Sequence, residues 1–375
     1  MIRYSKNKID FLTELRTSVN NYFDKKNIEP YGNKGLILKS FVMTLLYLGP
    51  LVLMVSGVIT SVVAVLAGWI LMGFGMAGLG MATMHDANHG SFSKHKWMNK
   101  LFGNSLYLLG GYPPNWRYQH NTLHHGYTNV EGHDEDIAPP EILRLSPHRP
   151  LKKIHRYQHL YAWFLYSLMT ISWAITKDFG RLEKYKKMGV KLSGKKKYST
   201  MLVELIISKI FYYAVFLVVP LLTVPVAWYW VVAGFLLMHF TGGLILAAVF
   251  QTAHVVPTSE YPLPDENNEM NNNWAAHQLY TTCNFAPRNR IFTWLVGGLN
   301  HQVEHHLFPN ISHIHYRNLA EIVQQKAKEF GLPYHVNKSF FGAIREHIRM
   351  LKLLGARQNV APATVTVRQN TAKAV

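Results

Sequence analysis

Histidines recur in three short clusters whose spacing is typical of metal ligands. The clusters read HDANH at residues 85–89, HNTLHH at residues 120–125 and HQVEHH at residues 301–306. With 20 histidines in 375 residues, chance supplies an HxxxH spacing about once, but an HxxxHH spacing only about 0.06 times. The longer spacing occurs twice, so the clusters predict a metal site rather than scattered surface histidines.

The spacing has a physical meaning if the clusters are helical. Residues i and i+4 share a helix face, so both imidazoles can reach one metal, and the doubled histidine adds a ligand about 100° around the axis for a second metal. Imidazole binds iron, zinc and copper, so the ligand type alone does not select the metal. Eight histidines exceed what one tetrahedral zinc uses, and two metals are the simpler interpretation.

Other side chains near the clusters are candidates for supporting roles. His254 ends the last apolar segment, as His85 follows an earlier one, which makes it a further candidate ligand. Ligating histidines usually donate their second N–H to a neighbouring acceptor, a role predicted for the carboxylates Asp86, Asp134, Asp136 and Glu304. The alternative for the carboxylates at residues 131–136 is a solvated acidic cluster.

The remaining histidines are not predicted to bind metal. His239 is predicted to pack within its helix, and the others are expected to be solvated: His95, His133, His148, His155, His159, His277, His313, His315, His335 and His347.

The elements that must position these residues include apolar segments long enough to cross a membrane. Hydrophobic residues make up 49% of the chain and charged residues only 16%, against about 25% charged in average soluble domains. A spanning helix needs about 20 apolar residues, and four segments qualify: residues 36–56, 58–81, 203–222 and 226–250. The single cysteine, Cys283, excludes an intrachain disulfide framework and a thiolate metal cluster.

The distribution of basic residues predicts the topology. Eight lie before residue 40, 18 lie between residues 85 and 200, and 12 lie after residue 250, whereas the two short connections hold none. The positive-inside rule then places both termini and residues 82–202 and 251–357 in the cytoplasm. This explains the net charge of +18 without a nucleic-acid partner. The polar first 35 residues do not resemble a signal peptide.

The segment Tyr157–Thr176 is apolar, but basic residues flank both ends, which favours a helix in the membrane interface. If it crossed the membrane, the third cluster would face the opposite side from the others. The prediction is therefore an all-α integral membrane protein with four transmembrane helices in two hairpins. A cytoplasmic helical cap holds the metal site, residues 1–357 form a single domain, and residues 358–375 form a disordered tail.

At the clusters the sequence resembles the membrane fatty-acid desaturase family. The matching stretches are HDANHG, HNTLHH followed by GYTN, and NHQVEHHLFP followed by NISHIHY, and the resemblance covers about residues 36–320. Gln302 ahead of His305-His306 is most similar to the acyl-lipid and front-end, linoleoyl-CoA desaturase-like branch. The resemblance implies a centre of two non-haem irons that uses O2 and two electrons to introduce a cis double bond into a fatty acyl chain, carried by CoA or a membrane lipid. The iron ligands that it implies are His85, His89, His120, His124, His125, His254, His305 and His306.

Two departures from the family pattern affect the details. Many relatives have histidine where Gln302 stands, and His301 precedes it; Gln302 is the favoured metal-facing residue, with His301 as an outer partner. No His-Pro-Gly-Gly stretch of a fused cytochrome b5 domain is present, so a separate electron donor of the ferredoxin, cytochrome b5 or flavin reductase type is expected. The basic run Lys184–Lys197 is a candidate docking site for that donor or for CoA phosphates, and an anionic-lipid contact is the alternative.

Two other functions compete with desaturation. A hydroxylase or ketolase on the same scaffold would share the iron ligands. A membrane metal transporter would carry its ligands within the membrane segments, whereas these clusters lie at the cytoplasmic ends. The expected location is a membrane of the bacterial inner-membrane type.

Overall fold

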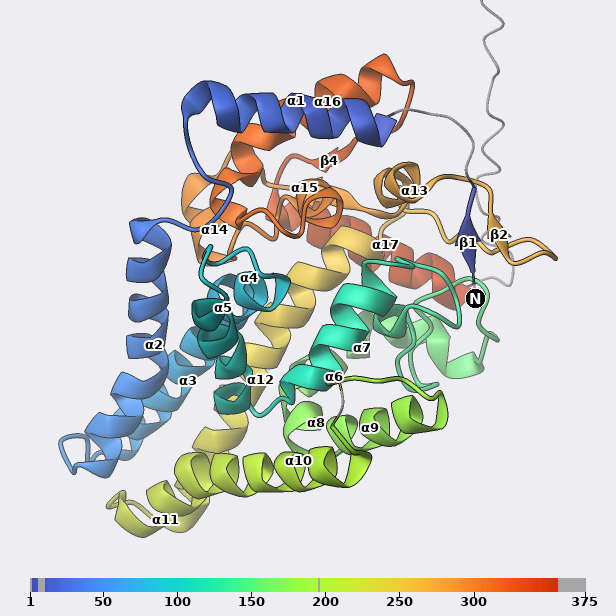
Figure 1. Ribbon diagram of the computed structural model, residues 1–375. Coiled ribbons are helices and arrows are strands. Elements are labelled where there is room, and N and C mark those ends of the chain that lie inside the picture. The colour runs from blue at the N-terminus through green and yellow to red at the C-terminus, as the bar shows by residue number, and fades with distance from the viewer. Residues whose placement is uncertain (1, 6–10, 195, 357–375) are drawn as a thin grey trace, which may run out of the picture.

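The computed structural model describes residues 2–5, 11–194 and 196–356, and these are mostly helical (Figure 1). Within this part of the chain, four helices are long and apolar enough to cross a membrane. They are Lys34–Val55 (α2), Val62–His89, Tyr198–Thr223 and Trp228–His254 (α12). The predicted segments at residues 36–56, 58–81, 203–222 and 226–250 fall largely within these helices. The prediction of residues 358–375 as a tail lies outside the described residues.

The second and third of these helices are not uniform α-helices. The second consists of α3 (Val62–Gly78), a π-helical turn (Leu79–Met84) and α4 (His85–His89). The third consists of α10 (Tyr198–Tyr213), a π-helical turn (Ala214–Val218) and α11 (Val219–Thr223). The second helix therefore continues past residue 81, where the sequence placed its end, and includes the whole first histidine cluster.

Close packing in the apolar bundle depends on glycine. A Cβ at Gly75 of α3 would collide with the backbone of Tyr47 in α2, and one at Gly234 of α12 would collide with the Trp69 ring of α3. Small residues let helix backbones approach closely where the surroundings are as apolar as the helices. The bundle surface is apolar as well, and Phe41 and Ile207 are among its exposed side chains, as expected for helices that face lipid.

The segment Tyr157–Thr176 is broken into short pieces and is not among the four long helices. It contains α7 (Gln158–Ser167), α8 (Met169–Ser172) and all but the last residue of a π-helical turn (Trp173–Lys177). Leu160 and Phe164 are exposed on one side, while Ala162 and Tyr166 pack in a core shared with Ala247 of α12. One face of α7 is thus apolar and exposed, as in helices that lie in a membrane interface, and the interfacial position stays a prediction.

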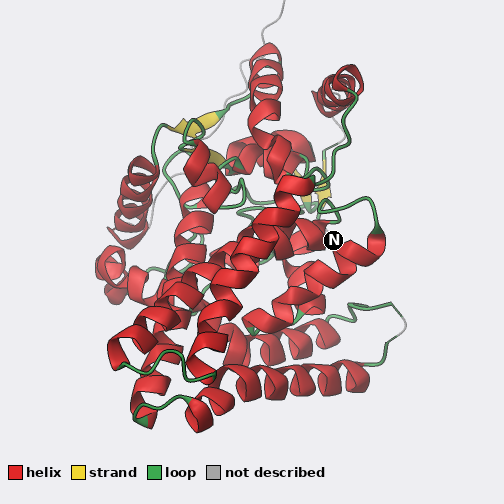
Figure 2. Ribbon diagram, turned by 90° about the vertical axis from the view of Figure 1, so that its left-hand side faces the viewer, coloured by secondary structure: helices red, strands yellow, loops and turns green. Residues whose placement is uncertain are grey.

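Shorter elements cover one end of the bundle (Figures 1 and 2). Helices α1 and α16 form the outermost layer of this cap, with Phe11, Leu15, Leu319 and Val323 in their shared core. The α-helices outside the bundle are α1 (Phe11–Lys26), α5 (Lys96–Gly103), α6 (Pro113–Arg117), α9 (Asp178–Lys187), α13 (Trp274–Thr281), α14 (Arg290–Leu295), α15 (Gln302–Leu307), α16 (Tyr316–Glu329) and α17 (Phe340–Ala356). A π-helical segment spans Tyr118–His124, and 3-10 turns span Asn104–Leu109, Glu135–Ile137, Lys153–Tyr157 and His313–His315.

The described residues also include two small sheets, so the all-α prediction is incomplete. Strand β1 (Arg3–Tyr4) pairs in parallel with β2 (Glu269–Met270), with Arg3 opposite Glu269. Strand β3 (Cys283–Phe285) pairs in parallel with β4 (His335–Asn337), with Cys283 opposite His335. These pairs are two or three residues long and tie distant cap segments together, which explains why no strand pattern is visible in the sequence.

Candidate metal centre

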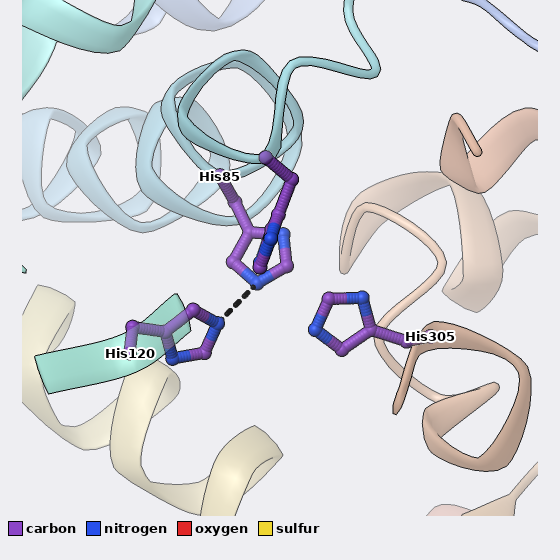
Figure 3. Close-up of side chains that lie close together, drawn as sticks. His85, His120 and His305 are labelled. Atoms are coloured by element: carbon purple, nitrogen blue, oxygen red, sulfur yellow. Dashed lines mark hydrogen bonds between the residues drawn. The ribbon is translucent and has the colours of Figure 1, made fainter. Parts of the chain in front are cut away.

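Four helical segments bring the predicted ligands to one place at the junction of bundle and cap. The first cluster forms α4, which ends at Gly90 in the left-handed conformation, with φ of 78°. The second cluster lies on the π-helical segment Tyr118–His124, the third on α15, and His254 is the last residue of α12. His85, His120 and His305 point toward one another from three of these segments (Figure 3).

The π-helical geometry of the second cluster brings three histidines together. The His125 amide donates to the His120 carbonyl at 3.0 Å, five residues back, where an α-helix would pair residues four apart. The ring centroid of His120 is 5.3 Å from that of His124 and 4.8 Å from that of His125. The wider turn therefore places both members of the histidine pair beside His120.

The histidines form two adjacent groups. One comprises His85, His89, His120 and His305, whose candidate ligand atoms lie within 4.8 Å of one another; we call it the first group. The second group comprises His124, His254 and His306, whose candidate ligand atoms also lie within 4.8 Å of one another. His125 lies between them, since it forms a further set with His305 and His306. His85 Nε2 and His120 Nε2 approach each other to 3.0 Å.

The chemistry of this donor set fits bound cations. All eight histidines are buried except His89, which is partly exposed. Among the described residues, no hydrogen-bond partner is found for the buried Nε2 atoms of His89, His254, His305 and His306. Each unpaired buried polar group costs about 1–3 kcal/mol. Coordination to a metal would give these nitrogens a partner, which explains why the fold brings so many of them together.

The electrostatics keep most of these imidazoles neutral, as metal ligation requires. Burial, and then the neighbouring histidines, hold the pKa values of His120, His125, His305 and His306 well below the usual value. His124 differs. Burial lowers its pKa, but the carboxylates of Asp134 and Asp136 outweigh that effect, so its pKa is raised overall.

The second ring nitrogen of several histidines is fixed by a specific acceptor or donor. His124 Nδ1 lies 3.1 Å from Asp134 Oδ2. Three more histidines bond through Nδ1 to groups that sequence reasoning missed. His305 bonds to the Tyr316 hydroxyl at 3.1 Å and His306 to Gln278 Oε1 at 2.8 Å. His254 bonds to the Thr281 carbonyl at 3.2 Å. No motif spacing links these partners to the histidines, so the sequence carried no signal for them.

The four predicted carboxylates lie in different settings. Asp134 is buried against His124, and Asp136 Oδ2 is 3.5 Å from the same Nδ1. Asp86 Oδ1 is 4.0 Å from His85 Nδ1. Glu304 is turned toward other residues and accepts from Asn284 Nδ2 at 2.8 Å and from the Tyr334 hydroxyl at 2.7 Å. Glu304 therefore fixes α15 itself rather than an imidazole of either group.

The two candidates that precede the last histidine pair also differ. Gln302 is buried beside His254. His301 is buried too, but its Nδ1 lies 3.6 Å from Glu304 Oε2. It belongs to none of the metal-ligand groups found among the described residues.

The expectation that the other histidines are solvated is wrong for half of them. His95 is exposed, and His239 packs in α12 against Tyr212 and Thr170, as expected. Five cap histidines are instead buried, and four of them bond to backbone carbonyls, because the cap folds over them and each neutral ring offers one donor and one acceptor. The buried five are His155, His277, His313, His315 and His347.

A cavity of about 610 Å³ lies beside the second group. Its apolar wall includes Leu143, Leu165, Met169 and Ala247, and its basic side chains are Lys177, Arg181 and Lys184. Asp136 and Gln251 also line it, and Gln251 Nε2 donates to the Asp136 carbonyl at 3.2 Å. Since Asp136 contacts His124, one residue separates the cavity from a clustered histidine. Burial lowers the pKa of Lys177 to about 8.

Comparison with known proteins identifies the class. The family model for fatty acid desaturase matches residues 60–338. An sn-1 linoleoyl-lipid 6-desaturase of Arthrospira platensis is 36% identical over 97% of this chain and 96% of its own length, and one from a Synechocystis strain is 32% identical over 93% and 96%. An acyl-lipid (8-3)-desaturase of Physcomitrium patens is 34% identical over 92% of this chain and 72% of its own length.

The chain thus belongs to the fatty acid desaturase family. It is an oxidoreductase that desaturates fatty acyl chains, and these similarities favour desaturation over the hydroxylase alternative. This confirms the resemblance drawn from the three histidine clusters.

We predict that Asp134→Ala destabilises the protein more than the matched substitution Asp265→Ala. Asp134 accepts the backbone N–H groups of Asn129 and Asp136, both at 2.9 Å, in addition to His124. Buried groups left without an acceptor cost about 1–3 kcal/mol each. Asp265 also accepts two backbone N–H groups, but it is exposed, so water replaces it. Thermal unfolding in detergent measures both, and equal shifts would contradict the prediction.

Proposed function

We propose that the two histidine groups hold two non-haem irons, and that the enzyme uses O2 and two electrons to introduce a cis double bond into an acyl chain of a membrane lipid. The observation that carries this proposal is the convergence of buried imidazole Nε2 atoms that lack partners among the described residues. Because relatives that match most of this chain are named linoleoyl-lipid 6-desaturases, we propose a lipid-bound linoleoyl group as the substrate.

The first group, His85, His89, His120 and His305, would hold one iron. The second group, His124, His254 and His306, would hold the other, and His125 lies where either could use it. Bound iron supplies the O2 activation that removes hydrogen from an unactivated methylene, a step for which side chains offer no acid, base or leaving group.

The chain's own residues would bind and orient the substrate in the cavity. Leu143, Leu165 and Met169 offer an apolar surface to an acyl chain, while Lys177 and Arg181 offer positive charge to the polar end of the lipid. The cavity borders Asp136, which contacts His124. An acyl chain lying there would have a methylene near the second group, and the walls would keep bulk water away from it.

We predict that the expressed protein converts supplied linoleate, in a host lacking polyunsaturated lipids, into a product with one further cis double bond. Gas chromatography of the lipids detects the product, and purified protein should contain about two irons per chain. His306→Ala should abolish the product and lower the iron content, whereas His95→Ala, at an exposed position, should leave both unchanged. A hydroxylated product, or stoichiometric zinc in an active preparation, would overturn the proposal.

A second prediction distinguishes the two residues ahead of the last histidine pair. Gln302 lies beside His254, so Gln302→Ala should lower product formation strongly. His301 lies outside both groups and near Glu304, so His301→Ala should lower it mildly. Iron content and product are measured on both purified variants. Selective loss of iron in His301→Ala would show that His301 is the metal-facing residue.

We propose further that both termini and the cap face the cytoplasm, with the helices arranged as two hairpins. The supporting observation is that α11 and the connection between α2 and α3 lie together at the end of the bundle opposite the cap (Figure 1). Cysteines introduced at Val58 and Thr223, both exposed, should react with an impermeant maleimide from outside intact cells. Lys191→Cys should react only after lysis, and the reverse pattern would refute this orientation.

A further inference from the structure

Three segments that are distant in the sequence meet beside the first histidine group. Lys39 comes from α2, Asp86 from α4, and His313 from the 3-10 turn that precedes α16. Lys39 Nζ lies 3.1 Å from His313 Nε2, and His313 Nδ1 lies 2.8 Å from Asp86 Oδ2. All three side chains are buried, with exposed fractions of 2%, 1% and 5% for Lys39, Asp86 and His313.

The chemistry of the partners sets the direction of these hydrogen bonds. A carboxylate only accepts and a lysine ammonium only donates, so His313 carries its proton on Nδ1 and accepts at Nε2. Asp86 Oδ2 also accepts from the Ser312 hydroxyl at 2.8 Å and from the His313 amide at 3.2 Å. The loop before α16 therefore holds one carboxylate oxygen, and the other oxygen is directed toward His85.

A buried lysine in an apolar helix requires an explanation. Ionisable groups in membrane segments are costly and usually mark functional sites, with a specific partner. Lys39 has two such partners: His313, and the ring of Trp294, whose centroid lies 5.2 Å from Nζ. Both belong to the segment that includes the third histidine cluster, so Lys39 links α2 to the elements around the site.

The two histidine groups differ in how their ligands are fixed. His124, His254 and His306 of the second group each bond directly through Nδ1 to a protein oxygen. In the first group His305 bonds in the same way, to the Tyr316 hydroxyl. His85 Nδ1, by contrast, lies 4.0 Å from Asp86 Oδ1, which is too long for a hydrogen bond. Asp86 directly follows His85 in α4, so the hydrogen bonds that hold the Asp86 carboxylate also hold the turn that carries His85.

We propose that His313 and Lys39 are positioning residues for the first metal site. They hold the Asp86 carboxylate, and through it the turn that carries His85 and His89, in the geometry that the first group requires. This inference rests on the proposed function, because it assumes that the first group binds metal. It gives a role to a histidine that the sequence placed at the solvated surface.

The test measures Co²⁺ affinity in the purified full-length protein after chelation. His306→Ala disables the second group, and in this background His313→Leu should weaken Co²⁺ binding about 10- to 100-fold, the usual effect of losing an outer-shell partner. His85→Ala disables the first group, and in that background His313→Leu should leave the affinity unchanged. Lys39→Met should act like His313→Leu, while His313→Asn, which keeps a donor to Asp86, should retain most of the affinity.

The matched control is His239→Leu. His239 is equally a buried histidine with two side-chain hydrogen bonds, to the Tyr212 hydroxyl at 2.8 Å and to Thr170 at 3.0 Å, but it lies outside the two groups. It should leave binding unchanged in both backgrounds. If His313→Leu does not fold, Lys39→Met and His313→Asn carry the test.

Two results would overturn the inference: unchanged affinity at the first group, or equal losses at both groups. A parent protein that binds no metal at all would instead refute the proposed function, so the two failures are distinguishable.

Discussion

The structure depends on one constraint, which is the burial of many neutral imidazoles whose nitrogens face one another. A neutral imidazole has one donor and one acceptor nitrogen. His254 and His306 donate through Nδ1 to the Thr281 carbonyl and to Gln278 Oε1, so their Nε2 atoms are left as acceptors, and acceptors that face one another cannot pair. The Nε2 atoms of His89, His254, His305 and His306, which have no hydrogen-bond partner in the described part of the chain, show the result. Their Nδ1 bonds, where present, fix the ring orientation and leave Nε2 directed inward. Acceptor nitrogens that face one another destabilise the folded protein when no cation is bound, and a bound cation makes the same arrangement favourable.

The apolar bundle supplies the rigidity that this arrangement needs. The first histidine cluster is continuous with α3 through a π-helical turn, and His254 is the last residue of α12. Helices α3 and α12 pack directly against each other, with Gly234 admitting the ring of Trp69. A shift between these helices would move His85 and His254 relative to each other. The packing of the membrane helices therefore sets the spacing of the two groups.

Much of this site could be predicted from the sequence, because the spacing of the clusters and the length of the apolar segments are local properties. The assignment at residues 301 and 302 illustrates the limit. His301 precedes α15 with φ of −103° and ψ of 60°, so it lies outside the helix and the i, i+4 rule does not apply to it. Gln302 is the first helical residue. The Nδ1 partners Tyr316 and Gln278 depend on tertiary contacts, which no spacing encodes.

The two groups are not electrostatically equivalent. In the second group, His124 bonds to Asp134, and a carboxylate partner makes an imidazole a more basic ligand. In the first group, Asp86 Oδ1 lies 4.0 Å from His85 Nδ1, and the charge of Asp86 is shared with His313 and lies near Lys39. The carboxylate effect is therefore stronger at the second group, which is also the one beside the cavity. The imidazoles that the carboxylates make more basic are therefore those on the side of the cavity.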